Sequence, residues 1–165
     1  MGLLKRVIKM LWKDLGIGKY VTNNRYYFNK YLIGNGNLLK IVELPQSKKD
    51  KLVTCKLVCY DYYFNREKII RCSAYSIKIP YTYLTEIKDG ISFMYWKAGD
   101  IIIPSELGIK NTFFTLKKEP YIITLNTADY CNEDAKIIAK RIGSNDEETI
   151  NPVYFERIGA VIKHS

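Results

Sequence analysis

The chain has 165 residues, 47% of them hydrophobic and 26% charged, with four cysteines and a formal net charge of +9. These values exclude wholesale disorder and predict a globular chain that buries a core without disulfide staples. No run of about 18 apolar residues is present, so we expect no membrane-spanning helix. One domain is predicted over residues 18–165, after an N-terminal segment (1–17) that can act as a docking arm.

The positive charge is concentrated at the start of the chain. Residues 1–51 contain 11 Lys and Arg against three acids, a net of +8, whereas residues 52–165 contain 15 against 14, a net of +1. A concentrated cationic region attracts nucleic acid, anionic lipid or an acidic protein surface. Composition alone does not choose among these three partners.

The first element is an amphipathic basic helix predicted over residues 2–15 and ended by Gly16. Its apolar stripe comprises Leu4, Val7, Ile8, Leu11 and Leu15, with Trp12 at the margin. Lysines at four-residue spacing (Lys5, Lys9 and Lys13) form a second ridge. Three placements remain open: against the chain's own body, on a partner subunit, or on an anionic membrane surface.

A connector over residues 18–24 is followed by a predicted hairpin, Arg25–Ile33 with Leu38–Leu44, because Asn-Gly between apolar runs favours a tight turn. Strand alternation places Arg25, Tyr27 and Tyr31 on one face. Interleaved cations and rings can hold phosphates and stack bases, although a solvated or subunit-covered face is the competing interpretation. The candidate nucleic-acid contacts are Lys5, Lys9, Lys13, Arg25, Tyr27, Tyr31, Lys48 and Lys49.

Two alternating runs between Leu52 and Ile79 predict a central hairpin with Asn65 and Arg66 at its tip. This register places Cys59 opposite Cys72, on a core face shared with Val53, Cys55 and Leu57. The outer face carries rings and cations, residue types enriched at interfaces. Together with the first helix, the interface candidates are Leu4, Val7, Ile8, Leu11, Trp12, Leu15, Tyr60, Tyr62, Arg71 and Tyr75.

Further strands are predicted in the second half of the chain, with a helical turn near residues 105–110 and a helix at about 127–142. The expected strands are Tyr81–Ile87, Ile91–Trp96, Ile101–Ile103, Asn111–Leu116, Tyr121–Leu125 and Val153–Ile162, with an acidic loop over 143–151. The predicted fold is mainly β (α+β): an antiparallel, hairpin-rich sandwich or partly open barrel with one N-terminal and one C-terminal helix. No internal repeat is visible.

No arrangement of residues predicts catalysis. His164, one residue from the end, is the only histidine, and the acidic pairs are explained by helix capping or by a solvated loop. The cysteines lack C-x-x-C spacing, so they are interpreted as reduced, small apolar residues. We expect no enzyme activity, no catalytic residues, no metal and no cofactor.

The leading hypothesis is a non-enzymatic structural subunit of a larger, oligomeric assembly that contacts its partner subunits through tyrosine-rich surfaces. Virion components, such as a phage head, head–tail ring or tail protein, fit this description. The alternative is sequence-nonspecific nucleic-acid binding by the basic first third, and the further alternative is peripheral binding to an anionic membrane. Without a signal peptide, the expected location is the virion or the host cytoplasm.

Overall fold

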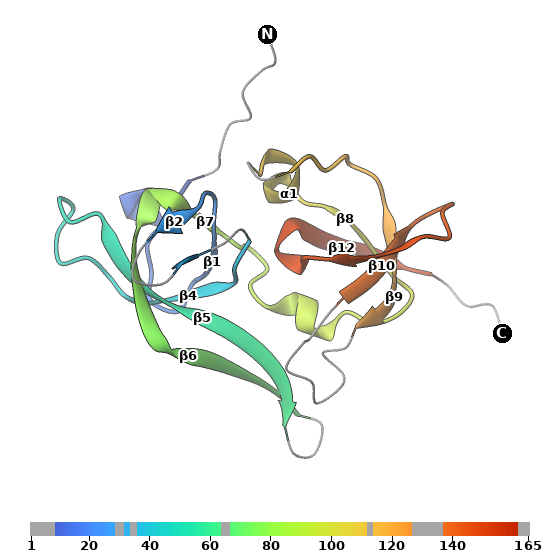
Figure 1. Ribbon diagram of the computed structural model, residues 1–165, viewed down its shortest axis with the longest axis horizontal. Coiled ribbons are helices and arrows are strands. Elements are labelled where there is room, and N and C mark those ends of the chain that lie inside the picture. The colour runs from blue at the N-terminus through green and yellow to red at the C-terminus, as the bar shows by residue number, and fades with distance from the viewer. Residues whose placement is uncertain are drawn as a thin grey trace, which may run out of the picture. The chain divides into compact units, whose positions relative to one another are not determined.

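The computed structural model describes residues 9–28, 32–33, 36–63, 67–111, 114–126 and 137–161, with side chains except at 28, 32–33, 59–63 and 67–75 (Figure 1). The chain forms two compact units. Unit 1 comprises Met1–Cys59, Arg71–Gly90 and Lys110–Thr115, and unit 2 comprises Tyr60–Ile70, Ile91–Ile109 and Leu116–Ser165. Both are built on antiparallel sheets, which confirms the mainly β prediction. The single domain expected over residues 18–165 stays a prediction.

The main sheet of unit 1 has five strands in the order β6-β5-β4-β1-β7, although the stretches of β5 and β6 that fall within Tyr60–Ile70 are counted with unit 2. These strands are β1 (Tyr20–Asn23), β4 (Leu39–Glu43), β5 (Leu52–Tyr63), β6 (Glu67–Pro80) and β7 (Leu84–Glu86). Two short strands, β2 (Tyr27–Phe28) and β3 (Leu32–Ile33), pair only with each other. Turns of 3₁₀ helix lie at Trp12–Asp14 and Tyr81–Tyr83.

Alternating apolar side chains of these strands form the core of unit 1. Ile41 pairs with Cys55 and Leu39 pairs with Leu57, and of these four only Leu57 is not fully buried. Val53 is also fully buried, so the predicted core face of the central hairpin is confirmed at Val53, Cys55 and Leu57. Each buried Val, Leu or Ile contributes about 1.5–3 kcal/mol. The predicted pairing of Cys59 with Cys72 lies outside the described side chains.

The sheet of unit 2 also has five strands, in the order β11-β10-β9-β8-β12. These are β8 (Asp100–Pro104), β9 (Tyr121–Asn126), β10 (Ile137–Arg141), β11 (Glu147–Ile150) and β12 (Phe155–Ala160). The helix α1 (Glu106–Lys110) follows β8, and 3₁₀ turns lie at Ser92–Tyr95 and Pro152–Tyr154.

The two five-stranded sheets share one topology. In each, the first strand in sequence (β1 or β8) lies between the second strand (β4 or β9) and the fifth (β7 or β12). In each, a 3₁₀ turn leads directly into the fifth strand. The fully buried positions of unit 2 again alternate along the strands, as at Ile102, Ile123 and Ala139.

The predicted N-terminal helix is wrong over its described part, Lys9–Leu15. Leu11 is extended (φ −106°, ψ 165°), and only Trp12–Asp14 form a 3₁₀ turn. The Met10 backbone amide donates a hydrogen bond to the Leu84 carbonyl at 2.9 Å, and Met10 is 2% exposed. Tertiary packing in an extended conformation therefore overrides the helical periodicity here. Residues 2–8 lie outside the described part of the chain.

The predicted helix over 127–142 is also wrong where it is described, because Ile137–Arg141 form strand β10. Ile137 and Ala139 are buried whereas Ile138 is half-buried, a period of two that β-branched residues favour. Residues 127–136 lie outside the described ranges. Both helix predictions were wrong in the described residues because a short apolar pattern is compatible with the helical period of 3.6 and with the strand period of two. Packing against the sheet decided between the two.

Strand boundaries differ from prediction at several further places. Tyr20–Asn23, predicted as part of a connector, form the interior strand β1, between β4 and β7, and Tyr27–Phe28 pair with β3 instead of β4. Ser92–Tyr95 form a 3₁₀ turn instead of a strand, and the predicted acidic loop contains β11. The central hairpin is confirmed, since β5 and β6 are hydrogen-bonded neighbours, and so are β8, β9, β12 and the helical turn α1.

Candidate functional site

A cluster of one arginine and two tyrosines lies beside the 3₁₀ turn of unit 1. The Arg25 guanidinium carbon lies 4.4 Å from the centroid of the Tyr83 ring. The Tyr27 ring meets the same ring edge to face, with centroids 5.7 Å apart and planes at 88°. Arg25 is exposed, and both tyrosines are half-buried. We call these three residues, together with the neighbouring Tyr26, the Tyr83 cluster.

Two buried asparagines at the end of β1 hold the backbone of this cluster in place. The Asn24 amide donates to the Tyr83 carbonyl at 2.7 Å, and its side-chain nitrogen donates to the Thr82 carbonyl at 3.2 Å. The Asn23 side-chain nitrogen donates to the Arg25 carbonyl at 3.0 Å. Since Asn23 and Asn24 are 1% and 5% exposed, these bonds are shielded from water. Residues 25–27 therefore leave β1 in a defined direction.

More rings and cations of unit 1 pair in the same way. Trp12 packs against Tyr81, the first residue of the 3₁₀ turn, at a centroid distance of 6.4 Å. The Lys40 ammonium lies 5.7 Å from the Tyr20 ring centroid. Tyr26, next to Arg25, is 54% exposed. Unit 1 thus presents rings and positive charges side by side.

The two units differ sharply in charge. Unit 1 contains 16 Lys and Arg against 5 Asp and Glu, a net of +11. Unit 2 contains 10 Lys and Arg against 12 Asp and Glu, a net of −2. The positive field of the protein therefore originates in unit 1, the unit that carries the Tyr83 cluster.

An arginine held against a tyrosine can recognise an anion and a flat group at once. Its N–H groups donate to phosphate oxygens, while the planar guanidinium stacks on a base. The contact with Tyr83 restricts the rotamers of Arg25, so less side-chain entropy is lost when a ligand binds. The Tyr83 cluster is thus suited to binding and offers no acid–base pair.

The structure places most predicted nucleic-acid residues on unit 1. Lys9, Lys13, Lys48 and Lys49 are exposed, and Arg25 and Tyr27 meet at one ring. Lys5 and Tyr31 lie outside the described residues. Tyr83 was not among the predicted site residues, because it lies 58 positions after Arg25 and nothing in the local sequence links the two.

The predicted interface residues are only partly described. Trp12 and Leu15 pack against the core of unit 1, and Leu11 is 47% exposed. Leu4, Val7 and Ile8 fall in the undescribed N-terminal residues. The side chains of Tyr60, Tyr62, Arg71 and Tyr75 are not described, so their interface role stays a prediction.

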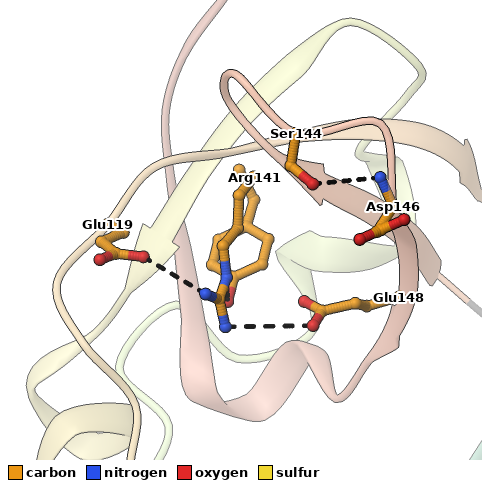
Figure 2. A network of polar contacts seen from close by, with 6 residues as sticks. Glu119, Arg141, Ser144, Asp146 and Glu148 are labelled. Atoms are coloured by element: carbon orange, nitrogen blue, oxygen red, sulfur yellow. Dashed lines mark hydrogen bonds and ion pairs between the residues drawn. The ribbon is translucent and has the colours of Figure 1, made fainter.

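A polar network in unit 2 surrounds Arg141, at the end of β10 (Figure 2). Its guanidinium lies between Glu119 at 3.7 Å and Glu148 at 4.0 Å, and its Nε donates to the Tyr121 hydroxyl at 3.1 Å. This hydrogen bond and the two carboxylates raise the pKa of Arg141. Because Arg141 is 52% exposed and already has acidic partners, the network serves to join the ends of neighbouring strands and contributes little stability.

The other described residues offer neither a reactive thiol nor a cluster of metal ligands. Burial raises the pKa of the Cys55 thiol to about 12, so it stays protonated and unreactive at neutral pH. Within the described ranges, no three His, Cys, Asp or Glu side chains come together as a metal site. Nor does any described helix have the length and apolar character that crossing a bilayer requires.

Comparisons of the chain with protein-family models, with curated proteins and with solved structures find no match. The function proposed below is therefore argued from the chain's own residues.

Proposed function

We propose that the protein acts by binding and not by catalysis, and that unit 1 binds nucleic acid without sequence specificity. The observation that carries this proposal is the net charge of +11 on unit 1 beside −2 on unit 2. A surface of this charge attracts a polyanion over the Debye length and gains affinity by releasing its counterions. The cation–ring contacts of unit 1 add groups that suit bases as well as phosphates.

The experiment is a titration of a fluorescently labelled single strand of mixed sequence, followed by anisotropy at about 50 mM and about 200 mM salt. With about four phosphate contacts, we expect the affinity to fall about 50-fold between these conditions. No binding at the lower salt concentration would contradict the proposal.

Two matched lysine pairs supply the control. Lys48 and Lys49 are adjacent and exposed in unit 1, and Lys117 and Lys118 are adjacent and exposed in unit 2. We expect Lys48→Glu/Lys49→Glu to weaken binding at least about tenfold, and Lys117→Glu/Lys118→Glu to change it less than about twofold. Equal losses would show that total charge matters and that unit 1 is not the binding unit.

The second candidate function is the structural subunit of a larger assembly, such as a virion. Exposed apolar side chains in unit 2 favour it: Tyr95 is 67% exposed, and Ile158, on the edge strand β12, is 56% exposed. Edge strands and exposed rings are common docking points. Light scattering or mass photometry tests this function, and a monomer that finds no partner in its native extract would contradict it.

We also make a proposal about the shape of each five-stranded sheet. We infer that each five-stranded sheet curls into a small, partly open barrel, because its first strand pairs with both the second and the fifth. The membrane-binding alternative required an amphipathic N-terminal α-helix, and Lys9–Leu15 do not form one.

A further inference from the structure

The two units match in hydrogen bonds as well as in strand order. At the start of the first strand, the Gly18 amide donates to the Ile41 carbonyl, and the Gly99 amide donates to the Ile123 carbonyl, both at 2.8 Å. Gly18 and Gly99 have φ values of +89° and +95°, a conformation that favours glycine. The chain therefore enters both sheets through the same turn.

An ion pair then links the first and fifth strands in both units, with its polarity reversed. In unit 1, Lys19 lies 3.4 Å from Glu86, whereas in unit 2 Asp100 lies 3.2 Å from Arg157. Lys19 and Asp100 each follow the positive-φ glycine. Glu86 and Arg157 face equivalent residues of the first strand, Val21 and Ile102. Matching positions with exchanged charges indicate one module present twice.

The match continues to the 3₁₀ turn. The residue after the first strand donates its amide to the last carbonyl of that turn: Asn24 to Tyr83 at 2.7 Å, and Ser105 to Tyr154 at 2.9 Å. Tyr83 and Tyr154 are therefore equivalent positions, and both are tyrosine. This equivalence allows the surroundings of one ring to be compared directly with those of the other.

The surroundings of the two tyrosines differ. In unit 2, α1 packs onto the turn so closely that a Cβ on Gly108 would collide with the Tyr154 carbonyl oxygen, and Tyr154 is 1% exposed. In unit 1, residues 25–28 occupy the corresponding stretch after the first strand without a helix, and Tyr83 is half-buried under Arg25. The same position is covered in one unit and accessible in the other.

We propose that units 1 and 2 are two copies of one module, and that the Tyr83 cluster is a binding site for single-stranded nucleic acid whose counterpart in unit 2 is closed by α1. This proposal rests on the nucleic-acid function proposed for unit 1 and names the site and the form of the ligand. Arg25 stacks on a base or holds a phosphate from its position on Tyr83, and the exposed Tyr26 ring supplies a second stacking surface.

A single strand fits this site better than a duplex. Stacking on Arg25 and Tyr26 needs unpaired bases whose faces are free, whereas a duplex buries those faces and presents its phosphates alone. Loss of one stacking platform weakens single-strand binding by roughly 5- to 150-fold, since base–ring stacking is worth about 1–3 kcal/mol. Loss of charge alone affects both forms alike.

The test compares Arg25→Ala with Arg141→Ala. Both remove an arginine that contacts a tyrosine ring, but Arg25 belongs to unit 1 and Arg141 to unit 2. In anisotropy titrations of the full chain, we expect Arg25→Ala and Tyr26→Ala each to weaken binding of a single strand at least fivefold, about 1 kcal/mol. Arg141→Ala should leave it within about twofold. Affinity for a duplex of the same sequence should fall less than twofold in Tyr26→Ala, which removes no charge.

The outcomes separate this proposal from the one on which it rests. If wild-type protein binds neither form at low salt, the nucleic-acid function itself fails. If it binds both forms, and Arg25→Ala and Tyr26→Ala behave like Arg141→Ala, unit 1 is a general polyanion surface and the Tyr83 cluster is not the site. If only acidic protein or anionic vesicles bind, the ligand class is wrong. Thermal melting of each variant excludes loss of fold as the cause.

Discussion

Units 1 and 2 have the same strand order and matching backbone hydrogen bonds but differ in charge. Both keep the strand order, the entry glycine, the amide bond to the 3₁₀ turn and an ion pair between the first and fifth strands. They differ in the sign of that ion pair and in net charge, +11 against −2. Backbone hydrogen bonds and buried apolar positions define the module, while the polar residues at matching positions differ between its copies.

The largest expected difference between the units concerns their ion pairs. Asp100 is 3% exposed in its side chain, so among the described residues Arg157→Ala leaves this buried carboxylate with the Lys97 amide, at 2.9 Å, as its partner. We expect it to lower the free energy of unfolding by about 2–3 kcal/mol, somewhat less than for a fully buried pair because Arg157 is half-exposed. Lys19→Ala should cost at most about 1 kcal/mol, since both partners are more than a third exposed. Urea denaturation measures both, and equal losses would contradict the asymmetry.

The covering of the second 3₁₀ turn by α1 is tested at Gly108. A methyl group there meets the Tyr154 carbonyl oxygen, so α1 must move away from the turn. We expect Gly108→Ala to lower stability by about 1–3 kcal/mol and to speed hydrogen exchange of the Ser105 amide, which bonds to that carbonyl. The control is Gly159→Ala in β12, where nothing lies within 4 Å of an added Cβ and the loss should stay near 0.5 kcal/mol. Unchanged exchange at Ser105 would show that α1 does not seal the turn.

The smallest expected effect concerns a core position that is Cys55 in unit 1 and Ala139 in unit 2. Both are fully buried, and each pairs with the equivalent isoleucine of the neighbouring strand, Ile41 or Ile123. Because unit 2 accepts alanine here, Cys55→Ala should cost only about 1 kcal/mol.

The thiol gives a separate readout through its pKa, which burial raises from 9.0 to about 12. The folded state binds this proton more tightly than the unfolded chain, so the contribution is complete below pH 9 and is lost as the pH rises towards 12. Stability should fall over this window in wild-type protein and less steeply in Cys55→Ala. Alkylation of Cys55 in native protein at neutral pH would contradict this burial.

The strands with the clearest alternation could be predicted, and the reason is the burial of one face. Val53, Cys55 and Leu57 were assigned to the core from their period of two, and the structure confirms Val53 and Cys55 as fully buried and Leu57 as partly buried against the core. The interior strand β1 was missed because Thr22 and Asn23 are polar, although they are 0% and 1% exposed. A buried asparagine needs a hydrogen-bond partner, and the Asn37 amide that donates to Asn23 is identified by tertiary structure alone.

Only part of the candidate site could be predicted, because one of its residues comes from a distant part of the chain. Alternation associated Arg25 with Tyr27, but Tyr83 could be joined to them only once β7 had paired with β1. The repeat escaped detection because only scattered positions keep the same residue in both copies, while others, such as the exchanged ion pair, differ.

By itself, the sequence determined that this protein is mainly β, that Val53 and Cys55 of the central hairpin are core residues, and that its positive charge is concentrated towards the N-terminus. These properties depend on neighbours in the chain and on composition. Tertiary structure decided that two stretches with helical periodicity do not form an α-helix where described, that the chain holds one framework twice, and that Arg25 lies over Tyr83. Each of these depends on contacts between distant segments, where the burial gained by pairing with a sheet outweighs local propensity.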